Sequence, residues 1–187
     1  MPEDSTTLHL LNAWRNGDQQ AARQLIARLQ PELRRIAAHH MRSERPNHTL
    51  QPTAIVNEAF LQMMRGMDID WRDRAHFLSV ASNVLRRILV EYARQAKATK
   101  RGGGSPHQAI EDNQPASPAS DFDRILDVHN ALEELETTDP RSAKIIELRY
   151  FGGLTEQETA ESMNVSLTTL RRDWQFARAW LAQRLAP

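Results

Sequence analysis

The sequence contains no cysteine, which excludes disulfide bonds, thiolate metal sites and cysteine nucleophiles. It also has no apolar run close to the roughly 20 residues that a membrane-spanning helix needs, and no apolar signal-peptide core at its N-terminus. We therefore expect a cytoplasmic chain without a membrane segment. With 40% hydrophobic residues among 187, it can still bury a core in one or two domains.

Motifs for enzyme chemistry are missing as well. The sequence has neither a G-x-x-x-x-G-K-[ST] phosphate loop nor a G-x-S-x-G nucleophile elbow. His39, His40, Glu44 and His48 are residue types that bind zinc, but adjacent histidines on a helix point about 100° apart and do not share a face. We expect no enzyme activity, no cofactor and no metal; a helical metal-dependent enzyme built on these histidines is the alternative.

The net charge is zero, with 24 basic and 24 acidic residues, but the charges are segregated. Residues 1–100 carry 15 Lys and Arg against 10 Asp and Glu, whereas residues 121–160 carry 4 against 10. Between Arg72 and Arg101, eight basic residues stand against two acidic ones. A local excess of this kind favours binding of phosphate groups.

Apolar residues recur at helical spacing, and the alternation typical of strands is absent. The pattern predicts two helices between Leu8 and Met41, separated by a turn at Gly17-Asp18, with Pro31 opening a third helix or kinking the second. It predicts a further helix over Pro52–Arg65 and a long basic helix, or a helical pair, over Ala75–Lys97. These helices form the first expected domain, residues 1–100.

The composition changes abruptly after residue 100. Gly102–Pro106 and Pro115–Pro118 lie in a stretch poor in large apolar residues, which predicts a flexible linker over residues 101–121. Helical periodicity then resumes at Phe122 and forms the second expected domain, residues 122–187. The predicted fold is all-α, with two small helical domains joined by a linker.

The C-terminal stretch contains two helix N-caps in succession. Thr155 and Glu158 form a T-x-x-E capping box, which predicts a helix from Glu156 to about Met163. Asn164 tolerates the left-handed conformation, and Ser166 is a second N-cap. The pattern predicts two helices joined by a tight turn.

The second of these helices has one apolar stripe and one polar face. The stripe consists of Leu167, Leu170, Trp174, Ala177, Leu181 and Leu185. On the opposite side, near the N-terminal end, are side chains able to bond base edges and phosphates: Thr168, Thr169, Arg171, Arg172 and Gln175. This is the pattern of a helix-turn-helix whose second helix reads DNA; the alternative is an ordinary helical hairpin with solvated arginines.

These stretches together resemble a bacterial RNA polymerase sigma factor of the extracytoplasmic-function (ECF) type, over nearly the whole chain. Asn57–Leu61 resembles the family's core-binding helix, and Ala75–Arg94 resembles its promoter-melting segment. Glu147–Thr155 is similar to the opening of its second domain. Leu170–Trp174 and Ala177–Leu181 are similar to a subgroup whose members often lie near Ser/Thr protein kinases.

The resemblance implies three groups of contacts and no catalysis by the chain itself. The first group would bind core RNA polymerase at its clamp coiled coil: Asn57, Glu58, Leu61, Gln62 and Arg65. The second would bind the promoter near the −10 element, where melting starts: Asn83, Arg86, Arg87 and Arg94. The helix-turn-helix residues Thr168, Thr169, Arg171, Arg172 and Gln175 would read the −35 element, with the polymerase flap as a further partner.

The sequence departs from the family before the core-binding helix. Where the family usually has an acidic cluster, this chain has Gln51–Ala54, with no carboxylate before Glu58. We hypothesise that phosphorylation of Thr53 or Thr49 supplies the missing negative charge at a helix N-terminus. The alternative is that Thr53 caps the helix and the interface is constitutive. A Ser/Thr kinase or an inhibitory anti-sigma protein would then be a regulatory partner.

A stand-alone helix-turn-helix regulator is the alternative function. Such a protein binds its own operator tightly without polymerase, whereas a sigma factor binds appreciably only with the polymerase core. The two functions are therefore separable by DNA binding with and without core polymerase.

Overall fold

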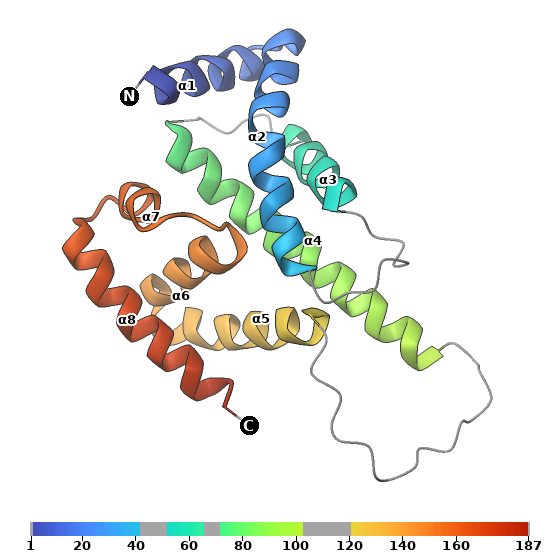
Figure 1. Ribbon diagram of the computed structural model, residues 1–187, viewed down its shortest axis with the longest axis vertical. Helices are drawn as coiled ribbons and strands as arrows, with labels where there is room; N and C mark the ends of the chain where they lie inside the picture. Colours follow the sequence, from blue (N-terminus) through green and yellow to red (C-terminus); the bar gives the residue numbers. More distant parts are fainter. Residues whose placement is uncertain (1, 42–51, 66–71, 103–120, 187) are drawn as a thin grey trace.

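The computed structural model describes residues 2–41, 52–65, 72–102 and 121–186, and within these ranges the regular structure is helical. The order along the chain is α1 (Pro2–Arg15), α2 (Gln19–His40), α3 (Pro52–Arg65), α4 (Arg74–Gly102), α5 (Asp121–Thr138), α6 (Pro140–Ile146), the π-helix η1 (Glu147–Phe151), α7 (Glu156–Ser162) and α8 (Leu167–Arg184) (Figure 1). The predicted all-α class is confirmed. Most of the predicted linker, residues 103–120, lies outside the described residues.

The turn between α1 and α2 forms where the sequence predicted it. Gly17 has a φ of 91°, and the Asp18 carboxylate accepts hydrogen bonds from the backbone N–H groups of Gln20 (2.8 Å) and Ala21 (3.1 Å). Pro31 lies inside α2 and does not open a third helix. The helix continues through Pro31 because Leu29 and Leu33 on either side are buried in the core.

The basic segment is one helix, α4, which is longer than predicted and runs diagonally through the molecule (Figure 1). It packs against α3 on one side and against α5, η1 and α7 on the other. Most of its buried side chains are apolar, among them Phe77, Leu78, Ala81, Leu85, Ile88 and Leu89. Helix α4 therefore contacts elements from both the earlier and the later part of the chain.

The N-terminal half (residues 2–102) and the C-terminal half (residues 121–186) share one apolar cluster. It includes Leu33 and Leu85 from the first half and Ile146 and Phe151 from the second, each 1% exposed or less. A smaller cluster of Ile145, Ala160 and Leu170 lies under the C-terminal helix pair. The two halves are thus packed together in this structure.

No helix in the described part of the chain combines the length and the apolar character that a bilayer span requires.

Candidate nucleic-acid interface

The predicted helix-turn-helix is present as α7, a tight turn and α8. Thr155 Oγ1 accepts from the Glu158 backbone N–H at 3.2 Å, and Glu158 Oε2 accepts from the Thr155 N–H at 2.9 Å, which completes the capping box. Asn164 has a φ of 53°, and Ser166 Oγ accepts from the Thr169 N–H at 3.1 Å. Both N-caps and the left-handed turn residue are therefore confirmed.

The apolar stripe of α8 packs as predicted near its centre but not at its end. Leu170 and Ala177 are completely buried, and Leu167, Trp174 and Leu181 are half-buried. Leu185 is 40% exposed, so its placement in the buried stripe was wrong. The reason is that α8 ends at Arg184, and Leu185 is the C-cap residue beyond the last packed turn.

The five residues predicted to read DNA lie together on the first turns of α8. Thr168, Arg171, Arg172 and Gln175 are exposed, and Thr169 is half-buried. Arg171 Nε donates to Glu156 Oε2 at 2.9 Å, and this hydrogen bond holds the pKa of the Glu156 carboxyl below its ordinary value. Arg172 contacts the adjacent Asp173 carboxylate at 3.2 Å. The guanidinium groups are thus available at the surface, next to the N-terminus of the helix.

Phe176 extends this exposed surface, and the sequence analysis did not single it out. Its side chain is 57% exposed, one helical turn after Arg172. Asp173, between them, forms an ion pair with Arg141 of α6 at 2.5 Å, which fixes this part of α8 to the helix below. The available signal was the four-residue spacing, which places Phe176 on the same side of α8 as Arg172 and Thr168.

The residues predicted to contact the −10 element have different environments on α4. Asn83, Arg87 and Arg94 are exposed, whereas Arg86 is only 6% exposed. Arg86 Nη1 donates to Glu136 Oε1 at 2.5 Å and to Glu147 Oε2 at 3.1 Å. Both acceptors belong to the C-terminal half, so in this arrangement the Arg86 guanidinium is bonded within the protein.

A histidine of α5 lies between two of these arginines. His129 Nδ1 accepts from Arg86 Nε at 3.3 Å, and Arg94 Nη2 lies 3.3 Å from His129 Nε2. Burial, and then the positive charge of Arg86, lowers the pKa of the His129 imidazole. The neutral ring is therefore the form that suits this position.

The residues predicted to bind polymerase and those predicted to melt DNA meet in one cleft. This cleft, about 620 Å³ in volume, lies between α3, α4 and α5, and its lining includes Glu58, Gln62, Arg87 and Arg94. Gln62 Nε2 donates to Glu58 Oε1 at 3.1 Å. The cleft walls are thus mainly polar and carry both signs of charge.

The other predicted polymerase contacts are on the same helix. Asn57 is exposed, and Leu61 is a large apolar side chain with 51% exposure. Arg65 is the last residue of α3, and its side chain lies outside the described part. An exposed leucine among polar neighbours suits a protein contact better than a nucleic-acid contact.

Of the two candidate phosphorylation sites, only Thr53 is among the described residues. Thr53 is the second residue of α3 and is half-buried, so it is not the N-cap that the alternative interpretation assumed. The first turn of α3 contains no acidic residue. Thr49 lies outside the described residues.

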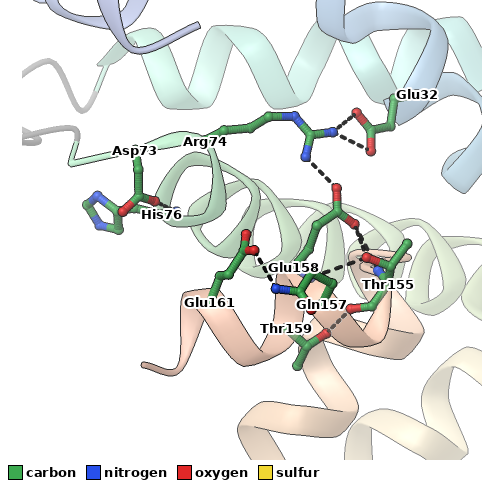
Figure 2. A network of polar contacts seen from close by, with 9 residues as sticks. All are labelled: Glu32, Asp73, Arg74, His76, Thr155, Gln157, Glu158, Thr159 and Glu161. Carbon is green, nitrogen blue, oxygen red and sulfur yellow. Dashed lines mark hydrogen bonds and ion pairs between the residues drawn. The ribbon is translucent and has the colours of Figure 1, made fainter. Parts of the chain in front are cut away.

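A network that the sequence analysis missed joins α4 to both α2 and α7 (Figure 2). Arg74 Nη2 donates to Glu32 at 2.9 Å, and Arg74 Nη1 donates to Glu158 of the capping box. Burial alone would raise the pKa of Glu158, but the hydrogen bonds from Arg74 and Thr155 outweigh it and hold that pKa below its ordinary value. The network positions the helix-turn-helix against the first half of the chain.

His40 also joins the two halves. It is 4% exposed, and its Nε2–H donates to the Tyr150 carbonyl at 2.8 Å. Its ring stacks on the Phe151 ring, with 5.7 Å between the ring centroids. Burial lowers the pKa of His40 to about 4, so the ring is neutral near pH 7. Glu44 and His48 lie outside the described residues, and among those described no group of three histidine or acidic side chains could hold a metal ion.

The fold and the site define an all-helical protein with a helix-turn-helix and a basic helix. The sequence profile of the family described as "ECF sigma factor" matches residues 4–187, and the chain belongs to this family. ECF sigma factors bind RNA polymerase and promoter DNA and direct transcription initiation without catalysing a reaction themselves.

No curated protein matches the chain. Among solved structures, the chain is similar to the one described as "Structure of CnrH in complex with the cytosolic domain of CnrY", with 20% identity, 96% of this chain and 97% of that chain covered, and a TM-score of 0.46.

Proposed function

We propose that this sigma factor contacts its promoters at two elements, each with one half of the chain. The C-terminal half reads the −35 element with Thr168, Thr169, Arg171, Arg172 and Gln175. The observation that carries this proposal is the exposure of four of these five side chains, all but Thr169, at the start of a properly capped α8. A helix of this kind presents its N-terminal residues to base edges in the major groove.

The N-terminal half binds the polymerase core and opens the −10 element. On α3, Asn57, Glu58, Leu61, Gln62 and Arg65 contact the clamp coiled coil, and Asn57 and Leu61 are exposed. On α4, Asn83, Arg86, Arg87 and Arg94 contact the promoter where its strands separate. The C-terminal half has the polymerase flap as its second protein contact.

Two weak DNA contacts on one chain become selective when the polymerase fixes their separation. Residues 1–100 and 122–187 act as the two binding domains, and residues 101–121 act as the tether that lets them reach separate elements. Because the polymerase core works in the cytoplasm, we place the chain there too.

Run-off transcription with purified core polymerase on genomic templates tests the proposal directly. Discrete transcripts that require the protein support it; no transcript on any template overturns it. A gel shift separates the stand-alone regulator from the sigma factor. Specific binding to duplex DNA by the isolated chain, unaffected by core polymerase, would favour the regulator.

Control of polymerase binding by a Ser/Thr kinase is part of the proposal, in line with the subgroup that the reading helix resembles. A phosphate on Thr53 or Thr49 adds negative charge near the N-terminus of α3, where the first turn has no carboxylate. Comparing the polymerase affinity of Thr53→Ala and Thr53→Glu tests this, and equal affinities reject it for Thr53. Control by an inhibitory anti-sigma protein is the competing mechanism.

A further inference from the structure

Phe176 of α8 is a large apolar side chain that the rest of the chain leaves uncovered. It is 57% exposed, and in the described part of the chain the other large apolar residues of comparable exposure are Leu61 and Leu185. Leu61 belongs to the proposed polymerase contact on α3, and Leu185 is the C-cap residue of α8. Phe176 instead lies in the middle of a helix whose other large apolar side chains are buried or half-buried.

The position of Phe176 continues the row of side chains assigned to the −35 element. Thr168, Arg172 and Phe176 follow one another at intervals of four residues, so they lie on the same side of α8. At about 1.5 Å of rise per residue, Phe176 lies about 6 Å beyond Arg172 along the helix axis. Successive base pairs are about 3.4 Å apart. In a helix lying along the groove, Phe176 therefore meets a base pair about two steps beyond the one that faces Arg172.

The surface beside Phe176 is hollowed, and its exposed charge is positive. A depression of about 380 Å³ is lined by Phe176, Arg172 and Asp173 of α8 and by Asp139, Arg141 and Ser142 of α6. The Arg172 and Arg141 side chains are 79% and 48% exposed, whereas Asp173 is 13% exposed and paired with Arg141. Asp139 is the N-cap of α6 and accepts from the Ser142 N–H at 3.0 Å. This charge favours a partner that carries phosphates.

Only one base presents an apolar group to a side chain in the major groove. All four bases present hydrogen-bond donors or acceptors there, and thymine adds its C5 methyl group. A phenylalanine ring forms no hydrogen bond with a base edge, so burial of this methyl group is the contact by which it distinguishes one base from another.

We propose that Phe176 is a specificity-determining residue that packs on the C5 methyl group of a thymine in the −35 element. The inference rests on the proposed function of α8 and adds one base to those that the helix reads. Burial of a single methyl group corresponds to about a fourfold gain in affinity over the same site without it.

Uracil pairs with adenine as thymine does and differs from it only in lacking the methyl group. On a promoter that the chain transcribes with core polymerase, each thymine of the −35 element, on either strand, is replaced singly by deoxyuridine. We expect the complex of core polymerase and full-length chain to bind one of these fragments about fourfold more weakly than the unmodified fragment in a competition assay. This test uses the wild-type protein and does not depend on the folding of a variant. Equal binding to every fragment overturns the proposal.

Phe176→Ala and Leu185→Ala form a matched pair of variants, because each removes an exposed apolar side chain, one within α8 and one at its end. Phe176→Ala should bind the thymine and uracil fragments equally. Leu185→Ala should keep the fourfold preference for thymine. If Phe176→Ala keeps that preference as well, another side chain contacts the methyl group and the proposal is wrong.

Run-off transcription with core polymerase separates this inference from the proposed function. No transcript on any template overturns both. Transcription that requires the protein but is unchanged by every uracil replacement overturns only the Phe176 contact. An equal loss of activity of Phe176→Ala on all fragments would then assign the ring to a protein partner instead of DNA.

Discussion

Arg172 has the most exposed side chain among the ion-paired arginines of α8, with 79% exposure against 60% for Arg171 and 55% for Arg184. Its nearest anion is the neighbouring Asp173, which is itself tied to Arg141. An exposed pair between adjacent residues costs little to break. Arg172 can therefore exchange its carboxylate contact for a base or a phosphate.

We expect Arg172→Ala to reduce transcription from a dependent promoter about 5- to 150-fold, as loss of about 1–3 kcal/mol at one base contact implies. Arg178→Ala, an exposed arginine farther along α8, is the control and should retain most activity. Run-off transcription at limiting promoter concentration measures both variants. Equal activities would remove Arg172 from the reading face.

The buried His40 makes the stability of the protein depend on pH. Because burial lowers the pKa of His40 from 6.5 to about 4, the unfolded chain binds more protons than the folded chain between these values. Stability from this group is complete above pH 6.5 and is lost as the pH falls toward 4. Between pH 7.5 and pH 5 the free energy of unfolding should fall by about 2 kcal/mol from this residue.

Urea denaturation of the wild type and of His40→Gln at the two pH values measures this loss. Glutamine keeps a donor for the Tyr150 carbonyl but does not titrate. The variant should lose less stability on acidification than the wild type. An equal loss in both proteins would show that other groups cause the pH dependence.

At the scale of elements, the N-caps determine where the reading helix begins. Ser166 Oγ accepts from the Thr169 N–H and contacts the Thr169 hydroxyl at 2.8 Å. Ser166→Ala should lower the free energy of unfolding by about 1 kcal/mol, whereas Ser166→Asp should retain the cap. Urea denaturation measures both changes; no difference between the two variants would contradict the capping role.

Elements whose signals are local could be predicted from the sequence. The α7 capping box, Asn164 and Ser166 each act within four residues, and all three were found in the predicted roles. The π-helix η1 was not predicted, because its wide turn depends on distant packing. A Cβ added at Gly152, the residue after η1, would lie 1.8 Å from Ser82 Oγ of α4.

This close approach gives a prediction for the docking of η1 on α4. Gly152→Ala should destabilise the protein by about 1–3 kcal/mol, because the added methyl group overlaps Ser82 and the Leu148 carbonyl. Adding Ser82→Ala should recover part of the loss, because it removes the closest atom but not the carbonyl at 2.7 Å. Thermal denaturation of the single and double variants measures the effect; a stable single variant would contradict the tight docking.

At the scale of the whole molecule, the sequence indicated which residues belong to the candidate site but not which of them pair with each other. Basic residues on α4 and acidic residues on α5 were visible as segregated charge. Their pairing could not be predicted, because Arg86 and Glu136 are 50 residues apart in the sequence. The predicted linker between them does not determine how α4 and α5 align. The same holds for Arg74 and Glu158, which are 84 residues apart.

The α4–α5 contact also has an unequal sensitivity to ionic strength along its length. The paired Lys97 and Asp123 are 47% and 43% exposed, so added salt screens them. At the other end, Glu136 of α5 is 47% exposed, but its partner Arg86 is also paired with Glu147 of η1, and these two side chains, at 7% and 4% exposure, are shielded from the solvent. Moderate salt should therefore weaken the contact first at Lys97 and Asp123, while the contacts of Arg86 remain formed. Amide hydrogen exchange would then accelerate around residues 97 and 123 before it changes around residue 86. Helices α4 and α5 would therefore begin to separate at the Lys97–Asp123 pair.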